Sequence, residues 1–279
     1  NTYRFFSEEM NSLAVERMTL VRDLHNAVEE EAFRVHYQPR VDVNDGRIVG
    51  VEALVRWQHP GVGLLPPSQF LGVAEDEGLI SEIDHFVLNA ALRQYRAWMD
   101  GEVTPPPRLT INISARTLRM AGLPETLRRM LREHGVDAHC LEIEVKEGDV
   151  MDDPPASIQR LRSLQDLGVR VAIDDFGTGY SAFGMLRQLP ITGLTVAGSF
   201  IRNVLTETGD AQIVTAIIAL AQSLRLSLVA KGVETPEHLA FLEHHNCSIA
   251  QGLLYSRPLP AREMDRVLAE GGVLVPVKS

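Results

Sequence analysis

The sequence predicts an α/β protein built as a modified TIM (β/α)8 barrel, with an antiparallel first strand and an N-terminal connector helix. From about residue 33 onward, eight short strand-like runs alternate with helix-like runs. This alternation is typical of a parallel sheet covered by helices, and 279 residues suit one barrel of this class. A doubly wound open sheet is the alternative, but no Gly-x-Gly-x-x-Gly turn follows the first strand.

The first element expected is an amphipathic helix over residues 7–31. Its apolar residues recur three or four positions apart, which gives a helix one narrow seam: Met10, Ala14, Met18, Val21, Leu24 and Val28. This seam would either pack on its own domain or pair with a second copy, and the sequence leaves both open. The chain starts with Asn1-Thr2 rather than Met, so we expect a fragment of a longer protein.

The barrel strands and helices follow in alternation. The expected strands are Phe33–Tyr37, Ile48–Trp57, Arg108–Ile113, Leu141–Val145, Val169–Ile173, Gly193–Val196, Ser227–Ala230 and Ser248–Ala250. The expected helices include Ser81–Met99, Pro124–Glu133, Ala156–Leu167, Asp210–Leu224 and Pro236–His244. Asn44-Asp45-Gly46 is a hairpin signal, so the first strand pair should be antiparallel. The chain thus divides into a connector at 1–32, a barrel domain at 33–272 and a tail at 273–279.

Composition narrows the classes of partner. A net charge of −10 argues against a basic duplex-binding surface, so DNA is not an expected partner. A small anionic ligand is compatible with this net charge, because a bound metal can make the local electrostatic potential positive. No apolar run reaches the roughly 18–20 residues of a membrane span. Cys140 and Cys247 are isolated and suit reduced thiols. We expect a cytoplasmic location, either free or as part of a membrane-anchored protein.

Polar residues recur where the predicted strands end, and in a barrel these ends meet at one mouth. In chain order they are Glu52, Asn112, Glu142, Asp174, Asp175, Thr195, Lys231, Glu234 and Gln251. A lone carboxylate at a strand end is usually a loop cap, but that explains repetition on separate strands poorly. Clustered carboxylates repel unless neutralised, and hard oxygen ligands suit Mg²⁺ or Mn²⁺. An Asp-Asp pair able to bridge two ions would fit two-metal phosphodiester hydrolysis.

An ordered set of motifs resembles the EAL family of cyclic-di-GMP phosphodiesterases. The motifs cover roughly residues 33–270: Tyr37-Gln38-Pro39, Glu52-Ala53-Leu54, Pro66-Pro67-x-x-Phe70, Asn112-Ile113-Ser114, Leu141-Glu142-Ile143, Asp174–Ser181, Gly232-Val233-Glu234-Thr235 and Gln251-Gly252. One matching tripeptide would not identify a family, but the whole set of motifs in this order is specific to the EAL family. The opening Arg4–Ser7 and its helix resemble the connector from a GGDEF (diguanylate cyclase-like) domain.

The resemblance implies a mouth that binds cyclic di-GMP and, in active members, two divalent cations. It implies that Glu52, Asn112, Glu142 and Asp174 are metal ligands, with Asp175 on the second ion. It implies that Arg56 contacts phosphate and that Leu54, Asp84, Asp175, Glu234 and Gln251 line the dinucleotide site. The Asp174–Ser181 loop resembles the family's loop that couples metal binding to dimerisation, so a homodimer is expected.

Two departures from the family pattern decide the expected activity. Thr195 stands where the family has a lysine that orients the attacking water, and the next aspartate of that motif is Ala197. Lys231 stands where the family has a glutamate, taken as general base or second-metal ligand. A lysine is protonated at neutral pH and can neither accept a proton nor bind a metal. Loss of a positioned base lowers a rate by about 10²–10⁴-fold.

We therefore expect a degenerate EAL domain that binds cyclic di-GMP as a receptor in bacterial second-messenger signalling, with little or no hydrolysis. Lys231 would partly replace the missing cation, or would pair with Glu142 or Asp175 and close the site. Two alternatives stay open: a weak metal-dependent phosphodiesterase that releases linear pGpG, and a ligand-free protein-interaction scaffold. An upstream GGDEF-like or sensor domain is the expected partner within the longer protein.

Overall fold

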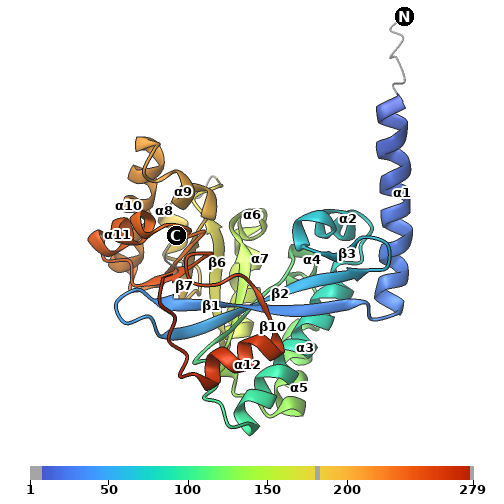
Figure 1. Cartoon of the computed structure of the whole chain (residues 1–279), viewed down its shortest axis with the longest axis horizontal. Helices are drawn as coiled ribbons and strands as arrows, with labels where there is room; N and C mark the ends of the chain where they lie inside the picture. The colour runs from blue at the N-terminus through green and yellow to red at the C-terminus, as the bar shows by residue number, and fades with distance from the viewer. Residues whose placement is uncertain (1–7, 180–182, 277–279) are drawn as a thin grey trace, which may run out of the picture.

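Eight strands close into one barrel in the computed structural model, which describes residues 8–179 and 183–276 (Figure 1). The ring consists of β1 (Phe33–Asp42), β2 (Ile48–His59), β4 (Leu109–Asn112), β5 (Leu141–Lys146), β6 (Arg170–Phe176), β7 (Gly193–Val196), β8 (Ser227–Lys231) and β9 (Ile249–Gln251). Neighbouring strands from β2 to β9 are parallel, whereas β1 runs antiparallel to both β2 and β9 and closes the ring. The predicted barrel and its antiparallel first strand are confirmed.

Helices surround this ring and lie between its strands. They are α1 (Glu8–Glu29), α2 (Leu71–Asp76), α3 (Ile80–Asp100), α4 (Ala115–Leu118), α5 (Leu123–His134), α6 (Glu147–Met151), α7 (Pro154–Gln165), α8 (Phe183–Leu186), α9 (Gly198–Asn203), α10 (Thr208–Leu224), α11 (Pro236–His244) and α12 (Ala261–Ala269), with short 3-10 turns at Pro67–Gln69 and Ala138–Cys140. Two short strands, β3 (Gly63–Leu65) and β10 (Leu259–Pro260), extend the sheet beside β2 and β1. Sequence analysis missed both because segments of two or three residues carry no periodicity.

The barrel has two distinct ends. Because β2 and β4 to β9 are parallel, their carboxyl ends gather at one end, called here the mouth, and their starts gather at the other, called the base. Side chains alternate along each strand, so every second residue points into the barrel. Unusually for a barrel interior, several of these inward side chains are charged: Arg40, Glu52, Glu142, Glu144 and Asp174 are all less than a tenth exposed.

Helix α1 stands away from the barrel body, as Figure 1 shows. Its C-terminal end is anchored by Leu24 and Ala27, which are buried, whereas Met18 is 73% exposed. The described part of the chain contains no helix that is both long and apolar enough for a bilayer. The Arg4–Ser7 opening lies outside the described residues.

Gly252 provides a test of how closely the segments around the mouth pack. A Cβ atom at this position would lie 2.0 Å from the backbone oxygen of Val233, which cannot move without displacing the loop after β8. We predict that Gly252→Ala lowers the free energy of unfolding by about 3 kcal/mol, because overpacking against backbone forces the loop to shift. Urea unfolding followed by circular dichroism measures this loss.

Gly209 in α10 is the matched control, because a Cβ there meets nothing within 4 Å. Gly209→Ala should change the free energy of unfolding by no more than about 0.5 kcal/mol. Equal stabilities for the two variants would contradict the close contact between Gly252 and Val233.

Candidate functional site

Lys231 lies at the centre of the mouth and points into a cup of carboxylates. Its Nζ lies 2.5 Å from Asp174 Oδ1, 3.0 Å from Glu144 Oε2 and 3.4 Å from Glu52 Oε1. These three carboxylates come from β6, β5 and β2, while Lys231 ends β8. One ammonium therefore contacts carboxylates from three strands. The sequence alone could not decide whether the Lys231 side chain points into the cup.

Neutral side chains complete the cup. Asn112 Nδ2 donates to Glu52 Oε1 (2.6 Å), and Gln251 Nε2 donates to Glu52 Oε2 (2.5 Å). Thr195 Oγ1 donates to Asp174 Oδ1 (2.5 Å). Both carboxylate oxygens of Glu52 and Oδ1 of Asp174 thus accept hydrogen bonds from several strands, so these acceptors of the cup are satisfied within it.

The electrostatics of the cup favour a charged lysine. Burial alone would lower the pKa of Lys231, but the carboxylates of Glu144, Glu52 and Asp174 outweigh it and raise that pKa well above its ordinary value. Burial would raise the pKa of Asp174, yet Lys231 and the Thr195 hydroxyl hold it below its ordinary value. Lys231 therefore stays protonated and Asp174 stays ionised at neutral pH.

The structure brings Glu144, and not Glu142, to this cup. Both side chains point into the barrel, but Glu142 lies two residues nearer the start of β5, about 6–7 Å toward the base. There Glu142 Oε1 accepts from Arg40 Nη1 (3.1 Å) and Thr110 Oγ1 (3.2 Å). The resemblance assigned the ligand position to Glu142; in space Glu144 holds the place beside Glu52 and Asp174.

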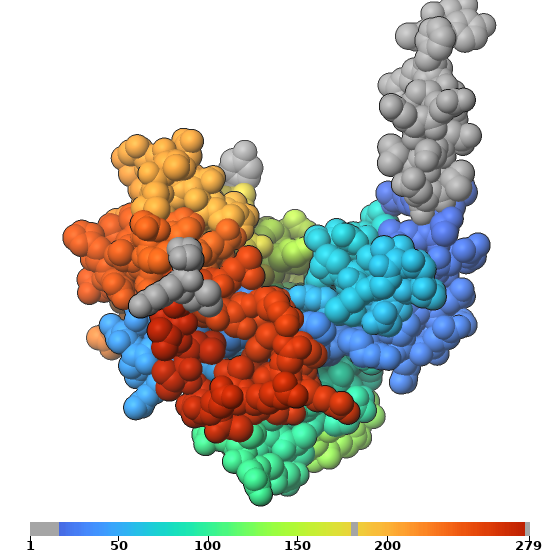
Figure 2. Space-filling model, viewed as in Figure 1, coloured from blue at the N-terminus to red at the C-terminus, as the bar shows by residue number. Residues whose placement is uncertain are grey.

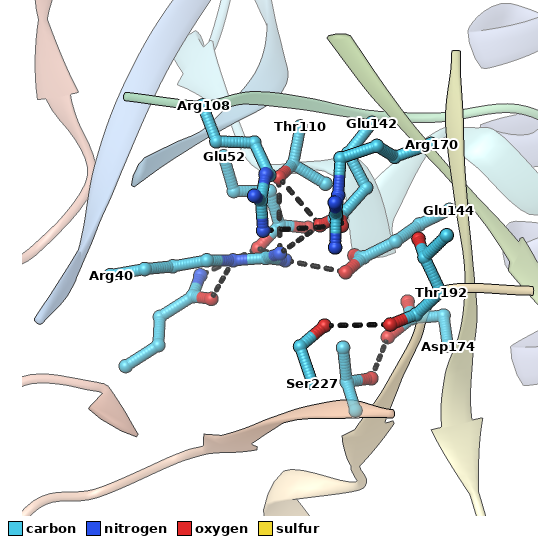
Figure 3. A network of polar contacts seen from close by, with 12 residues as sticks. Arg40, Glu52, Arg108, Thr110, Glu142, Glu144, Arg170, Asp174, Thr192 and Ser227 are labelled. Carbon is cyan, nitrogen blue, oxygen red and sulfur yellow. Dashed lines mark hydrogen bonds and ion pairs between the residues drawn. The ribbon is translucent and has the colours of Figure 1, made fainter. Parts of the chain in front are cut away.

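Arg40 is a buried residue of the site that the sequence analysis did not single out. Its Nη2 donates to Glu144 Oε1 (2.6 Å), its Nη1 to Glu142 and Thr110, and its Nε to Gln251 Oε1 (3.0 Å) (Figure 3). Arg40 therefore contacts Glu142 toward the base and Glu144 in the cup at the mouth. The available signal was an arginine within the otherwise strand-like segment after Tyr37.

Two pockets flank the cup and share Glu52, Leu54 and Asp174 in their walls. The first, about 240 Å³, is also lined by residues of α2 and α3, among them Leu71 and Asp84. The second, about 300 Å³, is also lined by Asp175, Lys231, Glu234 and Gln251. Figure 2 shows the notch at the mouth between the cyan surface near residues 60–80 and the orange surface. A ligand with two arms and a central polar group would fit this arrangement.

The remaining predicted ligand residues lie around these pockets or close to them. Asp84 is buried in α3, and its Oδ2 accepts from Ser114 N, Ser114 Oγ and Thr117 Oγ1. Burial raises the pKa of Asp84 despite these donors. Arg56 Nη1 donates to the backbone oxygen of Val55 (2.7 Å). Glu234 lies 4.0 Å from Arg202 Nη1.

The segment after β6 is held by Glu147, a second residue that sequence analysis did not single out. Glu147 is buried at the start of α6, and its Oε2 accepts from Gly177 N (2.8 Å) and Gly179 N (3.3 Å). Asp175 has a left-handed backbone with φ of 50°, which is uncommon outside glycine. The later loop residues Tyr180 and Ser181 lie outside the described residues.

The side chains present do not fit a divalent cation at the centre of the cup. Glu52, Asn112, Glu144 and Asp174 offer the oxygen atoms that Mg²⁺ or Mn²⁺ prefers. Lys231 Nζ, however, lies among them, and an ammonium has no lone pair to give a metal. Within residues 8–179 and 183–276, no group of three or more His, Cys, Asp or Glu is arranged to hold a metal ion.

Comparison with known proteins agrees with this architecture. Residues 21–258 match the EAL domain. The chain is 42% identical over 264 residues to the bifunctional diguanylate cyclase/cyclic di-GMP phosphodiesterase MucR of Pseudomonas aeruginosa, covering 95% of the chain and 38% of MucR. It is 40% identical over 269 residues to the cyclic di-GMP phosphodiesterase NbdA of the same organism, covering 96% of the chain and 34% of NbdA. The chain thus spans little more than a third of these relatives.

A solved structure extends the likeness to three dimensions. The PaMucR phosphodiesterase in complex with c-di-GMP superposes with a TM-score of 0.85 at 42% identity, over 88% of this chain and 99% of that one. The family match covers most of the chain, and the chain belongs to the EAL domain family.

Proposed function

We propose that this chain binds cyclic di-GMP at the barrel mouth and acts as a receptor in bacterial second-messenger signalling, with little or no hydrolysis. The observation that carries the proposal is the Lys231 ammonium within bonding distance of Glu52, Glu144 and Asp174. A fixed cation at this point neutralises part of the cup's charge. It therefore lowers the repulsion that a ligand with two phosphates would meet there.

The shape of the mouth supports a dinucleotide ligand. Its two pockets meet at Glu52, Leu54 and Asp174, so two bases can lie on either side of a central phosphate ring. The c-di-GMP complex of PaMucR, at 42% identity, supports the same ligand. Arg56, on the same face of β2 as Glu52 and Leu54, is suited to a phosphate because its guanidinium offers paired donors.

Hydrolysis requires a group that takes a proton from the attacking water. Lys231 is protonated and cannot do so. Thr195 donates a hydrogen bond to Asp174, so it positions that carboxylate and supplies no positive charge near the attacking water. With no base at position 231 and no lysine at 195, a rate about 10²–10⁴-fold below that of an intact site follows.

A metal-dependent phosphodiesterase that releases pGpG is the second candidate, and the relatives favour it. MucR and NbdA are both named as cyclic di-GMP phosphodiesterases. Glu52, Asn112, Asp174 and Asp175 remain in this chain, and we propose Glu144 in place of Glu142 as the ligand of the β5 position. A protein-interaction scaffold without ligand is the third candidate, but the two pockets at the mouth favour the first two.

We also propose how this chain fits into a longer protein. We propose that residues 1–32 connect an upstream GGDEF-like or sensor domain to a barrel at 33–272, with a tail at 273–279. We also propose a homodimer through the Asp174–Ser181 loop and a cytoplasmic location for the domain.

Binding without turnover has a characteristic calorimetric signature. Cyclic di-GMP titrated into the purified chain with Mg²⁺ present should give a saturable one-site isotherm that returns to baseline after each injection. Arg56→Ala should weaken binding at least tenfold because it removes a phosphate contact, whereas Arg129→Gln on the outer face of α5 should leave it unchanged. Isothermal titration calorimetry measures the affinity of the natural chain and of both variants.

Two results would overturn this prediction. Sustained heat after each injection, with pGpG detected by chromatography, would establish the phosphodiesterase candidate. Absence of heat at two temperatures would favour the scaffold.

Positions 195 and 231 account for the low rate that we propose. The double variant Lys231→Glu, Thr195→Lys should hydrolyse cyclic di-GMP at least tenfold faster than the natural chain, because it restores an acidic residue and a lysine at the two departing positions. Its melting temperature should also rise with added Mg²⁺, while that of the natural chain should not. Chromatographic detection of pGpG and a thermal shift assay provide the two readouts.

Lys146→Glu is the matched control, since Lys146 is an exposed lysine at the rim of the first pocket. That variant should gain neither activity nor a response to Mg²⁺. A double variant that binds the dinucleotide yet hydrolyses it no faster would show that positions 195 and 231 do not cause the defect.

A further inference from the structure

The base of the barrel holds a second concentration of charge, at the end opposite the mouth. Arg108 directly precedes β4, Arg170 begins β6, and both side chains point toward Glu142 on β5 (Figure 3). Arg40 approaches the same carboxylate from β1. Three guanidinium groups therefore surround one glutamate.

The hydrogen bonds at the base are incomplete. Arg108 Nη1 and Arg170 Nε both lie 3.7 Å from Glu142 Oε2, beyond hydrogen-bond distance. The Nε atoms of both arginines and Glu142 Oε2 are buried without a hydrogen-bond partner. Buried polar groups are normally satisfied. The two Nε donors lack an acceptor and Glu142 Oε2 lacks a donor, so the missing partner is a group that accepts from the arginines and donates to the carboxylate, as a hydrogenphosphate ion does.

The charges at the base are also unbalanced. Arg40 is matched by Glu144 as well as Glu142, but Arg108 and Arg170 share Glu142 alone. Burial lowers the pKa of Arg108, Glu142 opposes that shift, and Arg170 and Arg40 add to it. The positive charges of Arg108 and Arg170, both beside one carboxylate, favour binding of an anion between the two guanidinium groups.

An incoming ligand can reach the pair. The side chains of Arg108 and Arg170 are 28% and 31% exposed, whereas that of Glu142 is 4% exposed. The neighbouring hydroxyl groups are engaged as donors, since Thr192 Oγ1 donates to Val171 O (3.1 Å) and Ser227 Oγ to Thr192 O (3.0 Å). The two arginines are thus the free donors of this cluster among the described residues.

We propose that Arg108 and Arg170 form a binding site for a phosphate-type oxyanion at the base of the barrel. Guanidinium groups present paired N–H donors that match the oxygen spacing of phosphate. The site shares no residue with the two pockets of the mouth. It does not depend on cyclic di-GMP binding or on hydrolysis.

Inorganic phosphate is the probe, added at constant ionic strength with chloride as the balancing anion. The melting temperature of the natural chain should rise saturably by about 2–4 °C, because a ligand that binds only the folded state stabilises it. Arg108→Gln and Arg170→Gln should each abolish the rise. Arg129→Gln and Arg56→Ala should keep it, the first because it lies on the outer face of α5 and the second because it belongs to the mouth.

A direct measurement on the natural chain covers the case in which a base variant does not fold. The ³¹P resonance of phosphate should broaden in the presence of the protein and sharpen again when sulfate is added as competitor. A linear, non-saturating rise with phosphate would overturn the proposal, since general salt effects behave in that way. Loss of the rise in Arg56→Ala but not in Arg108→Gln would move the anion to the mouth and would overturn it as well.

Discussion

The interior of this barrel is built around buried charge that must be compensated from within. Four carboxylates line its axis, Glu142 toward the base and Glu52, Glu144 and Asp174 at the mouth. Arg40, Arg108, Arg170 and Lys231 are the cations that face them. An unpaired buried carboxylate is strongly unfavourable, so each of these cations constrains where its partners lie and how the strands around them are arranged.

Lys231 compensates the carboxylates of the mouth in a different way from a bound metal ion. A divalent cation brings two positive charges and leaves coordination positions for water or ligand. An ammonium brings one charge, donates hydrogen bonds and offers no such position. The carboxylates of the cup are therefore compensated by a residue of the chain itself. A lysine at position 195 would meet the charge of Lys231 at short range, whereas the Thr195 hydroxyl donates to Asp174 without adding a charge.

The barrel itself was largely predictable, since all eight ring strands fall at or within a few residues of their predicted positions. Their short β-branched runs and the Asn44-Asp45-Gly46 turn carry local signals that need no knowledge of distant contacts. The position of each inward side chain along the barrel axis was harder to predict from the sequence. Glu142 and Glu144 share a face of β5, and alternation alone does not say which one reaches the mouth. The direction of Lys231 and the role of Arg40 depend on partners from five other strands, which no local pattern encodes.

Helix α1 gives the molecule a mechanical property. Its 22 residues measure about 33 Å; Leu24 and Ala27 are buried near its C-terminal end, and Arg17 forms an ion pair with Asp76 of α2. A tilt of the whole helix by about 10° about its C-terminal end would move its N-terminal end by about 6 Å. Small rearrangements where α1 meets the barrel are therefore magnified into larger displacements at the N-terminal end of the helix.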